Sequence, residues 1–320
     1  MSIYKQSIPS VDLNLFIHGT AEEKMEFVRQ LGDAYQTIGF VAVKGHLLSE
    51  NLSGRLYEGA KKFFQLPDVA KLKYEIEGMH GQRGYTSFGK EHAKGQLAGD
   101  LKEFWHFGQD LPKDSNMNPS EYPPNVYVKE VPEFMAAGME AYHQLEKTGV
   151  YMLRAIALFL NLDEFYFDEK VKLGQSILRP IHYGPITGEP ENAVRSAEHE
   201  DINLITLLMG ASADGLEVLN KQHEWIQVTA LPEQIVCNVG DMLQRLTNNK
   251  LKSTTHRVVN PPRELWHTSR YSIPFFMHPK SNMSLACLPD CVTSENPKQY
   301  EDCTAGQFLE ERLTEIGLKK

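Results

Sequence analysis

Residues 270–277, Arg-Tyr-Ser-Ile-Pro-Phe-Phe-Met, form an apolar run in which a single arginine stands beside aromatic and branched side chains. In an extended strand alternate side chains project from one face, so Arg270 and Ser272 share a face. A guanidinium offers a carboxylate two parallel hydrogen bonds, and the hydroxyl adds a third donor. A surface arginine paired with a nearby acid is the plainer interpretation, but an arginine in a mainly apolar strand requires a dedicated anion. The run therefore predicts a strand that presents a carboxylate-binding pair.

Short apolar runs of the same kind recur through the second half of the chain, after Leu173. Clusters of Gly, Asn, Asp and Pro separate several of them. Short strands at such spacing favour a β-sandwich or a β-barrel. The predicted strands cover residues 176–178, 203–208, 215–219, 235–239, 256–259 and 270–277.

The first half of the chain has mainly helical periodicity. Thr20 and Glu23 form a capping-box pattern, which predicts the start of a helix. Residues 81–124 are rich in Gly, Pro and polar side chains and predict loops and short strands. The predicted helices cover residues 28–38, 52–63, 132–160 and 308–318, and two further strands are predicted at 7–13 and 39–45.

His199-Glu200-Asp201 places two potential metal ligands at positions i and i+2. On a strand these side chains project from one face, so one ion could meet both. His256 follows 55 residues after Asp201. Two imidazoles and one carboxylate form the facial triad of non-haem Fe(II) enzymes, which leaves positions open for a chelating co-substrate and dioxygen. Taken alone, the pair is better explained as two exposed polar residues on a strand edge, and zinc hydrolases also use such ligands.

Composition limits the classes of partner. The chain has 320 residues, a formal net charge of -9 and no block of basic residues. Such a chain repels a phosphate backbone, so we expect no nucleic-acid partner. The four cysteines contain no CxxC pair, which fits reduced thiols in a cytoplasmic protein better than a disulfide framework. No signal peptide and no run of 18 apolar residues is evident, so no membrane partner is expected.

The order HxD, a distal histidine and then RxS resembles the isopenicillin N synthase-like family of Fe(II)/2-oxoglutarate-dependent oxygenases. The resemblance implies a mainly β fold with α: a double-stranded β-helix (jelly roll) core flanked by helices. It implies two parts within one structural unit, a helical and mixed part over residues 1–170 that packs on a jelly-roll core with a C-terminal helix over residues 171–320. Further similar segments lie at residues 8–12, 38–46, 83–85, 102–108, 240–244, 248–253 and 308–313.

The resemblance also implies roles for individual residues. His199, Asp201 and His256 would ligate the metal and be the catalytic centre, while Arg270 and Ser272 would grip the C5 carboxylate of 2-oxoglutarate. Tyr183 matches a tyrosine that often contacts the oxoacid end of the co-substrate. Ile181 stands where many members carry asparagine, which is a departure on that side of the co-substrate. Five residues fall in segments that line the pocket in relatives, although packing explains each of them as well: Tyr85, Trp105, Phe107, Arg195 and Met277.

The expected function is oxidation of a small organic substrate by dioxygen, with hydroxylation, desaturation or cyclisation as outcomes and with release of succinate and CO₂. Fe(II) is the expected metal, 2-oxoglutarate the co-substrate, and ascorbate a supporting reductant. One alternative is an Fe(II) oxidase of the same fold that does not use 2-oxoglutarate, like isopenicillin N synthase or aminocyclopropane-carboxylate oxidase. A non-catalytic jelly-roll binding protein and a zinc hydrolase are more distant alternatives.

Overall fold

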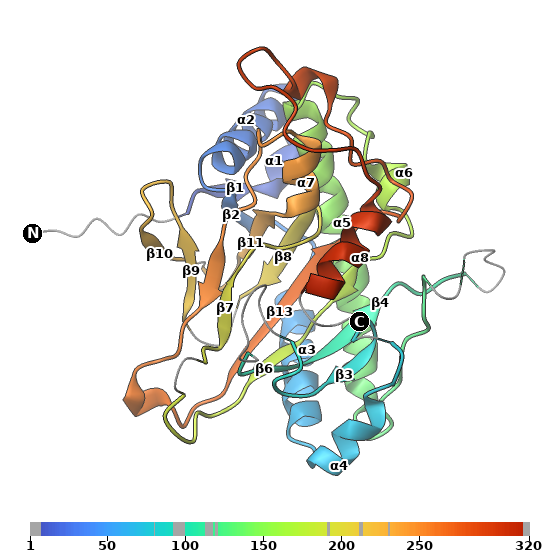
Figure 1. The fold of residues 1–320 in the computed structure, drawn as a ribbon, viewed down its shortest axis with the longest axis vertical. Helices are drawn as coiled ribbons and strands as arrows, with labels where there is room; N and C mark the ends of the chain where they lie inside the picture. Colours follow the sequence, from blue (N-terminus) through green and yellow to red (C-terminus); the bar gives the residue numbers. More distant parts are fainter. Residues whose placement is uncertain are drawn as a thin grey trace, which may run out of the picture.

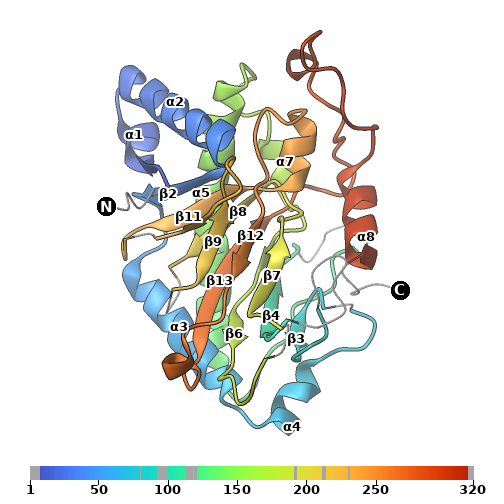
Figure 2. The same ribbon diagram turned by 60° about the vertical axis from the view of Figure 1, so that its left-hand side comes forward.

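Two β-sheets face each other and enclose the interior of the second half of the chain (Figure 1, Figure 2). The computed structural model describes residues 8–79, 81–91, 100–112, 118, 121–190, 193–210, 214–229 and 231–315. The larger sheet has the order β1 (Ser10–Asp12), β2 (Phe40–Lys44), β11 (Ile235–Val239), β8 (Ile205–Met209), β13 (Arg270–Met277), β5 (Ile177–Leu178), β4 (Glu103–Gly108) and β3 (Gly84–Thr86), and β6 (Ile181–Tyr183) pairs with β13 and β4. The smaller sheet has the order β10 (Trp225–Gln227), β9 (Leu216–Leu219), β12 (His256–Val258) and β7 (Ser196–His199).

Helices cover the outer face of the larger sheet (Figure 2). The long helix α5 (Pro132–Phe159) packs against β4, β5, β8 and β13, while α2 (Ala21–Thr37) and α3 (Glu50–Phe64) pack on α5. Thr20 and Glu23 form the expected capping box at the start of α2. The remaining helices are α1 (Leu13–His18), α4 (Asp68–Lys71), α6 (Asp168–Val171), α7 (Asp241–Leu246) and α8 (Ala305–Glu315), with short 3₁₀ turns at Leu72–Tyr74, Arg263–Leu265 and Pro289–Cys291.

The jelly-roll expectation is confirmed, and the six strands predicted in the second half are all present. Strands β11 and β13 have the predicted bounds, and the other four have shifted ends. Four short helices, α1, α4, α6 and α7, were not predicted. Helix α8 begins at Ala305 rather than Phe308; residues 316–318 of that prediction and Ser7 of the first predicted strand lie outside the described residues. Among the described residues, no helix combines the length and the apolar character needed to cross a bilayer.

One predicted geometry is wrong. Strand β7 ends at His199, so Asp201 does not lie on a strand. It lies in the turn that follows, where its carbonyl accepts a hydrogen bond from the Asp241 backbone N–H at 2.7 Å. The i, i+2 rule for strands therefore does not explain how the Asp201 side chain comes to face His199; the turn does.

Gly39 connects α2 to β2 in a backbone conformation that other residues avoid. Its φ is +73°, and a Cβ built there would lie 2.2 Å from the Lys252 carbonyl oxygen. We expect Gly39→Ala to lower the free energy of unfolding by about 2 kcal/mol or more, because the left-handed conformation alone costs about 1–2 kcal/mol and the backbone contact adds to it. Urea denaturation followed by circular dichroism measures the change.

Gly54 provides the matched control for this substitution. It lies in α3, and no atom lies within 4 Å of the position that a Cβ would take there. Gly54→Ala should therefore raise the free energy of unfolding by about 0.5–1 kcal/mol, since alanine loses less backbone entropy in a helix. Equal effects of the two substitutions would show that Gly39 is not under the steric constraint described.

Candidate functional site

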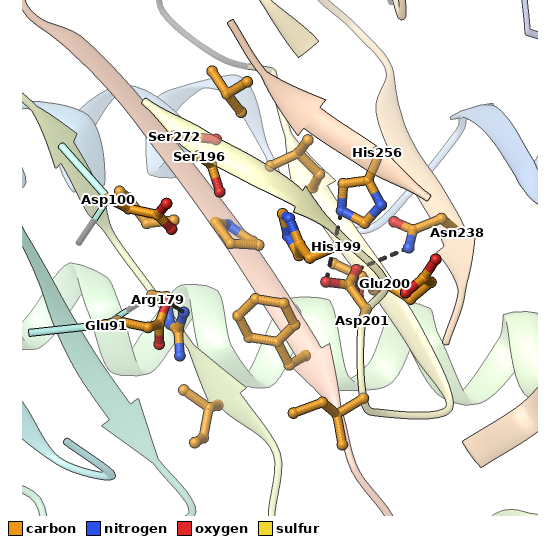
Figure 3. A pocket seen from close by; sticks show the side chains of 18 of the residues that line it. Glu91, Asp100, Arg179, Ser196, His199, Glu200, Asp201, Asn238, His256 and Ser272 are labelled. Atoms are coloured by element: carbon orange, nitrogen blue, oxygen red, sulfur yellow. Dashed lines mark hydrogen bonds and ion pairs between the residues drawn. The ribbon is translucent and has the colours of Figure 1, made fainter. Parts of the chain in front are cut away.

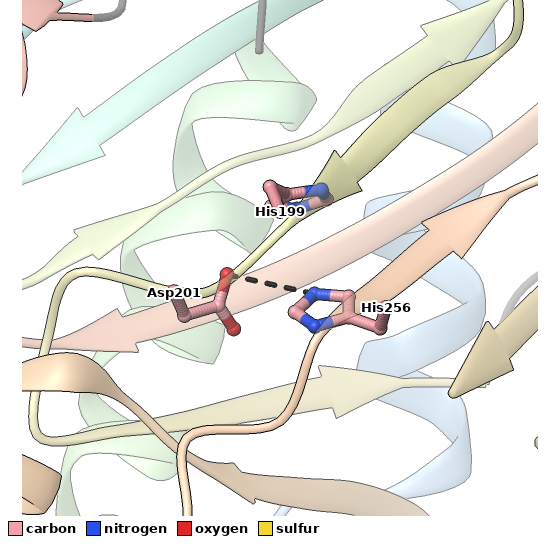
Figure 4. Close-up of side chains that lie close together, drawn as sticks. All are labelled: His199, Asp201 and His256. Atoms are coloured by element: carbon pink, nitrogen blue, oxygen red, sulfur yellow. Dashed lines mark ion pairs between the residues drawn. The ribbon is translucent and has the colours of Figure 1, made fainter. Parts of the chain in front are cut away.

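The side chains of His199, Asp201 and His256 lie close together where strands β7 and β12 pair (Figure 4). His199 and His256 are direct cross-strand partners on β7 and β12, and their ring centroids lie 4.4 Å apart. Asp201 Oδ1 lies 3.7 Å from His256 Nε2. One nitrogen or oxygen of each of the three residues falls within 4.8 Å of those of the other two. The structure thus brings together the three ligands predicted from the sequence.

Backbone carbonyls orient both imidazoles. His199 Nδ1 donates to the Ala197 carbonyl at 2.7 Å, and His256 Nδ1 donates to the Thr254 carbonyl at 3.1 Å. A carbonyl can only accept, so each Nδ1 carries a proton, and in the neutral imidazole each Nε2 then keeps its lone pair. Burial lowers the pKa of His199 first, and the neighbouring His256 adds to this, which favours the neutral ligand form.

The Asp201 carboxylate is held through one of its two oxygens. Oδ2 accepts hydrogen bonds from Thr206 Oγ1 at 2.6 Å and from Asn238 Nδ2 at 2.8 Å. Oδ1 is the oxygen that faces His256. Burial tends to raise the pKa of Asp201, but the two histidines and these two donors hold it below its ordinary value. The carboxylate is therefore ionised and oriented with one oxygen available.

This donor set suits a divalent transition metal. Two neutral imidazole nitrogens and one carboxylate oxygen on one side of a site are typical of non-haem Fe(II), whereas the hard ions Mg²⁺ and Ca²⁺ prefer oxygen ligands alone. Contacts that fix each ligand atom, like those from Thr206 and Asn238, are also typical of genuine metal sites. The residues present therefore fit an Fe(II) ion.

Arg270, Ser272 and Tyr183 line the same cavity as the three ligands. Arg270 and Ser272 are buried on β13, with exposed fractions of 1% and 4%. Tyr183 is the cross-strand partner of Arg270 on β6, and the Arg270 guanidinium lies 5.1 Å from the centre of its ring. Ile181 also lines the cavity, so the position occupied by asparagine in many relatives is apolar here.

None of the five side chains expected in pocket-lining segments is among the residues that line the cavity. Tyr85, Trp105, Phe107 and Met277 belong to the hydrophobic core, so the packing interpretation is correct for them. Trp105, for example, lies edge-on to Phe63 with ring centroids 4.9 Å apart. Arg195 is buried beside the cavity wall and donates to the Thr268 carbonyl at 3.0 Å. Burial lowers its pKa, and the positive charge of Arg270 lowers it further.

The cavity has a volume of about 370 Å³ and extends from the three ligands across the larger sheet to helix α8. Polar groups stand on several of its sides in Figure 3: the triad on one, Ser272 and Ser196 on another, and Glu91 with Arg179 on a third. Apolar side chains also line the cavity, including Ile177, Phe276 and Leu309. A space of this size suits a small organic molecule.

The charged groups on the third side were not predicted from the sequence. Arg179 Nη1 donates to Glu91 Oε1 at 3.1 Å, and Lys102 Nζ donates to the same oxygen at 2.7 Å. Burial tends to raise the pKa of Glu91, but these two cations outweigh it and hold the pKa well below its ordinary value. No local motif links these residues, because 88 positions separate Glu91 from Arg179; only the fold brings them together.

Comparison with known proteins agrees with this geometry. Residues 8–130 match the family described as "non-haem dioxygenase in morphine synthesis N-terminal", and residues 175–279 match the 2OG-Fe(II) oxygenase superfamily. The proline hydroxylase buaE of Petromyces alliaceus is 30% identical, with 96% of this chain and 98% of the relative covered. The 2-oxoglutarate-Fe(II) type oxidoreductase hxnY of Emericella nidulans is 28% identical, with 94% and 88% covered.

Solved structures show the same likeness. A 2OG-Fe(II) oxygenase family protein from Caulobacter crescentus is 41% identical, with a TM-score of 0.86 and coverage of 97% of this chain and 99% of that one. A Neurospora crassa protein solved in complex with alpha-KG and thymine is 29% identical, with a TM-score of 0.84 and 98% of each chain covered. The whole described fold therefore has close counterparts, and not only the metal-binding segment.

Proposed function

Because the chain belongs to the 2OG-Fe(II) oxygenases, in their isopenicillin N synthase-like group, we propose that His199, Asp201 and His256 hold its Fe(II) and that Arg270 and Ser272 hold its 2-oxoglutarate. The protein is a 2-oxoglutarate-dependent dioxygenase. The observation that carries the residue assignment is the convergence of the three ligand atoms within 4.8 Å, in a cavity whose wall contains a buried arginine.

The protein and the metal divide the chemistry between them. Bound Fe(II) supplies the activation of dioxygen that couples decarboxylation of 2-oxoglutarate, to succinate and CO₂, with oxidation of the substrate. His199 and His256 contribute neutral nitrogens and Asp201 one negative charge, so the site keeps a net positive charge that favours an anionic oxoacid. Arg270 offers a planar fork to the far carboxylate, Ser272 adds a hydroxyl donor, and Tyr183 contributes to the oxoacid side.

The substrate is a small organic molecule. Among relatives, the Neurospora crassa protein binds thymine and buaE is named as a proline hydroxylase. We propose hydroxylation, desaturation or ring closure of a molecule of this size, since the mainly apolar cavity of about 370 Å³ can exclude water around it. Dioxygen is the second substrate.

An anaerobic titration tests the proposed centre. Adding 2-oxoglutarate to the Fe(II) protein should produce a metal-to-ligand charge-transfer band, and admission of dioxygen with ascorbate should release succinate. An Fe(II) oxidase that does not use 2-oxoglutarate would give neither the band nor succinate. The absence of both signals from protein with bound iron would reject the assignment of the co-substrate site.

Thr206 and Asn238 are proposed to position the metal-binding carboxylate, and Thr206→Val tests this without a change of shape. The substitution removes the 2.6 Å hydrogen bond to Asp201 Oδ2. Loss of such a supporting contact typically costs about 10–100-fold in metal affinity or activity, so we expect Fe(II) to bind at least about 10-fold more weakly. Anaerobic competition against a chelator measures the affinity.

Thr148→Val is the control for that substitution. Thr148 is a buried threonine of α5 whose hydroxyl donates to the Gln144 carbonyl, and it does not line the cavity. Thr148→Val removes a buried threonine hydroxyl, as Thr206→Val does, but it should leave Fe(II) affinity unchanged. Equal metal affinity in the wild type and in Thr206→Val would count against the positioning role.

We also propose that the parts 1–170 and 171–320 form one structural unit. In support, β1, β2, β3 and β4 of the first part join the same sheet as β8, β11 and β13 of the second. A cytoplasmic location is a further proposal, and the state of the thiols supports it: Cys237, Cys287, Cys291 and Cys303 form no disulfide.

A further inference from the structure

Arg179 lies on the cavity wall in a fixed orientation. Its guanidinium carbon lies 4.4 Å from the ring centre of Phe104 and 5.1 Å from that of Phe276. Its Nε donates to His106 Nε2, and its Nη1 donates to Glu91 Oε1. Among the described residues no partner accepts a hydrogen bond from Nη2, although the side chain lines the cavity. A planar donor is thus held rigid with part of its hydrogen-bonding capacity unused.

Glu91 complements Arg179 with an unused acceptor. Its side chain is 8% exposed and lines the cavity. Oε1 accepts from both Arg179 and Lys102, whereas Oε2 is buried and has no hydrogen-bond partner among the described residues. A buried carboxylate oxygen without a donor is costly, so a ligand that reaches the Glu91 carboxylate from the cavity and supplies a donor would be favoured.

The charges around this pair balance. Lys102 also pairs with Asp100 at 2.8 Å, so two cations face two carboxylates. Burial and the nearby Arg179 hold the pKa of His106 well below its ordinary value, which keeps that imidazole neutral. A carboxylate ligand bound to Arg179 would be repelled by the Glu91 carboxylate. A cationic ligand bound to Glu91 would be repelled by Arg179 and Lys102. The balance therefore favours a neutral ligand.

We propose that Glu91 and Arg179 select a neutral substrate that carries an N–H group beside a carbonyl, as in a cyclic amide or imide. The N–H donates to the Glu91 carboxylate, the carbonyl accepts from Arg179 Nη2, and a flat apolar face rests on Phe276, which also lines the cavity. This inference rests on the proposed function, because it places the substrate on the side of the cavity away from the metal ligands and Ser272 (Figure 3).

Calorimetric titration of the anaerobic protein with Fe(II) and 2-oxoglutarate tests the inference without turnover. The probes are two matched pairs: thymine with 1,3-dimethylthymine, and 2-pyrrolidinone with N-methyl-2-pyrrolidinone. Cyclopentanecarboxylate serves as a charged comparator. In at least one pair the N–H member should bind about 10-fold or more tightly than its N-methyl partner and than the carboxylate, since a hydrogen bond to a charged group has about that effect.

Two substitutions then assign the preference to residues. Glu91→Gln should weaken binding of the N–H probe by about 10–100-fold and remove the discrimination within the pair. Arg179→Lys, which keeps the charge, should weaken binding of the same probe by about 10-fold. Glu164→Gln is the matched control, because its carboxylate pairs with Lys24 at 2.8 Å on the helical side of the molecule. Glu164→Gln should change neither the affinity for the N–H probe nor the discrimination within the pair. Thermal melting shows whether each variant is folded, and Arg179→Lys retains the test if Glu91→Gln is not.

The outcomes separate the two proposals. If the wild type forms no charge-transfer band with 2-oxoglutarate, the proposed co-substrate site is rejected, however tightly the probes bind. A normal band rejects the present inference if no N–H probe binds, if paired probes bind equally, if the carboxylate binds more tightly, or if folded Glu91→Gln and Arg179→Lys bind as the wild type does.

Discussion

Replacing His256 with alanine is expected to reduce succinate formation by roughly a thousandfold or more. Loss of a supporting contact at a metal site already costs about 10–100-fold, and removal of a ligand itself must cost more. His256 supplies one of only two imidazoles in the cluster that the described residues form. Fe(II) binding, measured by anaerobic competition with a chelator, should weaken in parallel with activity.

His143→Ala is the control for this experiment. His143 lies on α5 with 55% of its side chain exposed, so its removal should leave both activity and Fe(II) affinity unchanged. Because His256 also packs edge-on against Phe40, with ring centroids 5.4 Å apart, thermal melting must accompany the assay. A folded His256→Ala protein with wild-type succinate release would show that the metal lies elsewhere.

Replacing Arg270 with alanine is expected to weaken 2-oxoglutarate binding by about 3 kcal/mol or more, roughly 150-fold. Truncating one partner of a buried, hydrogen-bonded charge pair costs about 2–5 kcal/mol, because the other charge is left unpaired. Arg270 is 1% exposed, so little water can replace it. Arg270→Lys should recover part of the loss, since it restores the charge without the fork. Titration of the charge-transfer band measures the affinity.

Arg154→Ala is the matched control for Arg270→Ala. Arg154 pairs with Asp168 at 2.6 Å on the helical side of the molecule, so its loss should not change 2-oxoglutarate affinity. The Fe(II) affinity of Arg270→Ala should also remain near that of the wild type, because the three ligands are intact. If Arg270→Ala lowers Fe(II) and 2-oxoglutarate affinity equally, a general disturbance of the cavity explains the result better than loss of a carboxylate partner.

The sequence predicted those parts of the site that short-range patterns record. His199 and Asp201 stand two positions apart, as do Arg270 and Ser272, and alternation along a strand is visible in one short segment. The turn that orients Asp201 was not predicted, since it depends on a hydrogen bond from Asp241, 40 positions away. The contacts of Thr206 and Asn238 with that carboxylate were missed for the same reason: they arise only when β8 and β11 pair.

Family resemblance of whole segments misled the expectations about the pocket. Trp105 and Phe107 lie in a segment with the right family resemblance, but every residue of β4 is buried and these two face the helical layer. Sequence periodicity does not distinguish the inner from the outer face of a strand that is buried on both sides. Glu91 and Arg179 were missed because ordinary charged residues at distant positions carry no local signal of burial or pairing.

The pairing of His199 with His256 across β7 and β12 has a consequence for how such a centre persists through mutation. The distance between adjacent strands is a property of the peptide backbone common to all sheets, and it does not depend on which side chains fill the interior. Core substitutions can therefore accumulate, and the surrounding walls can be remodelled for new molecules, while the gap between these two imidazoles stays constant. The metal-binding residues can therefore stay in place while substitutions in the cavity walls change which substrate is preferred.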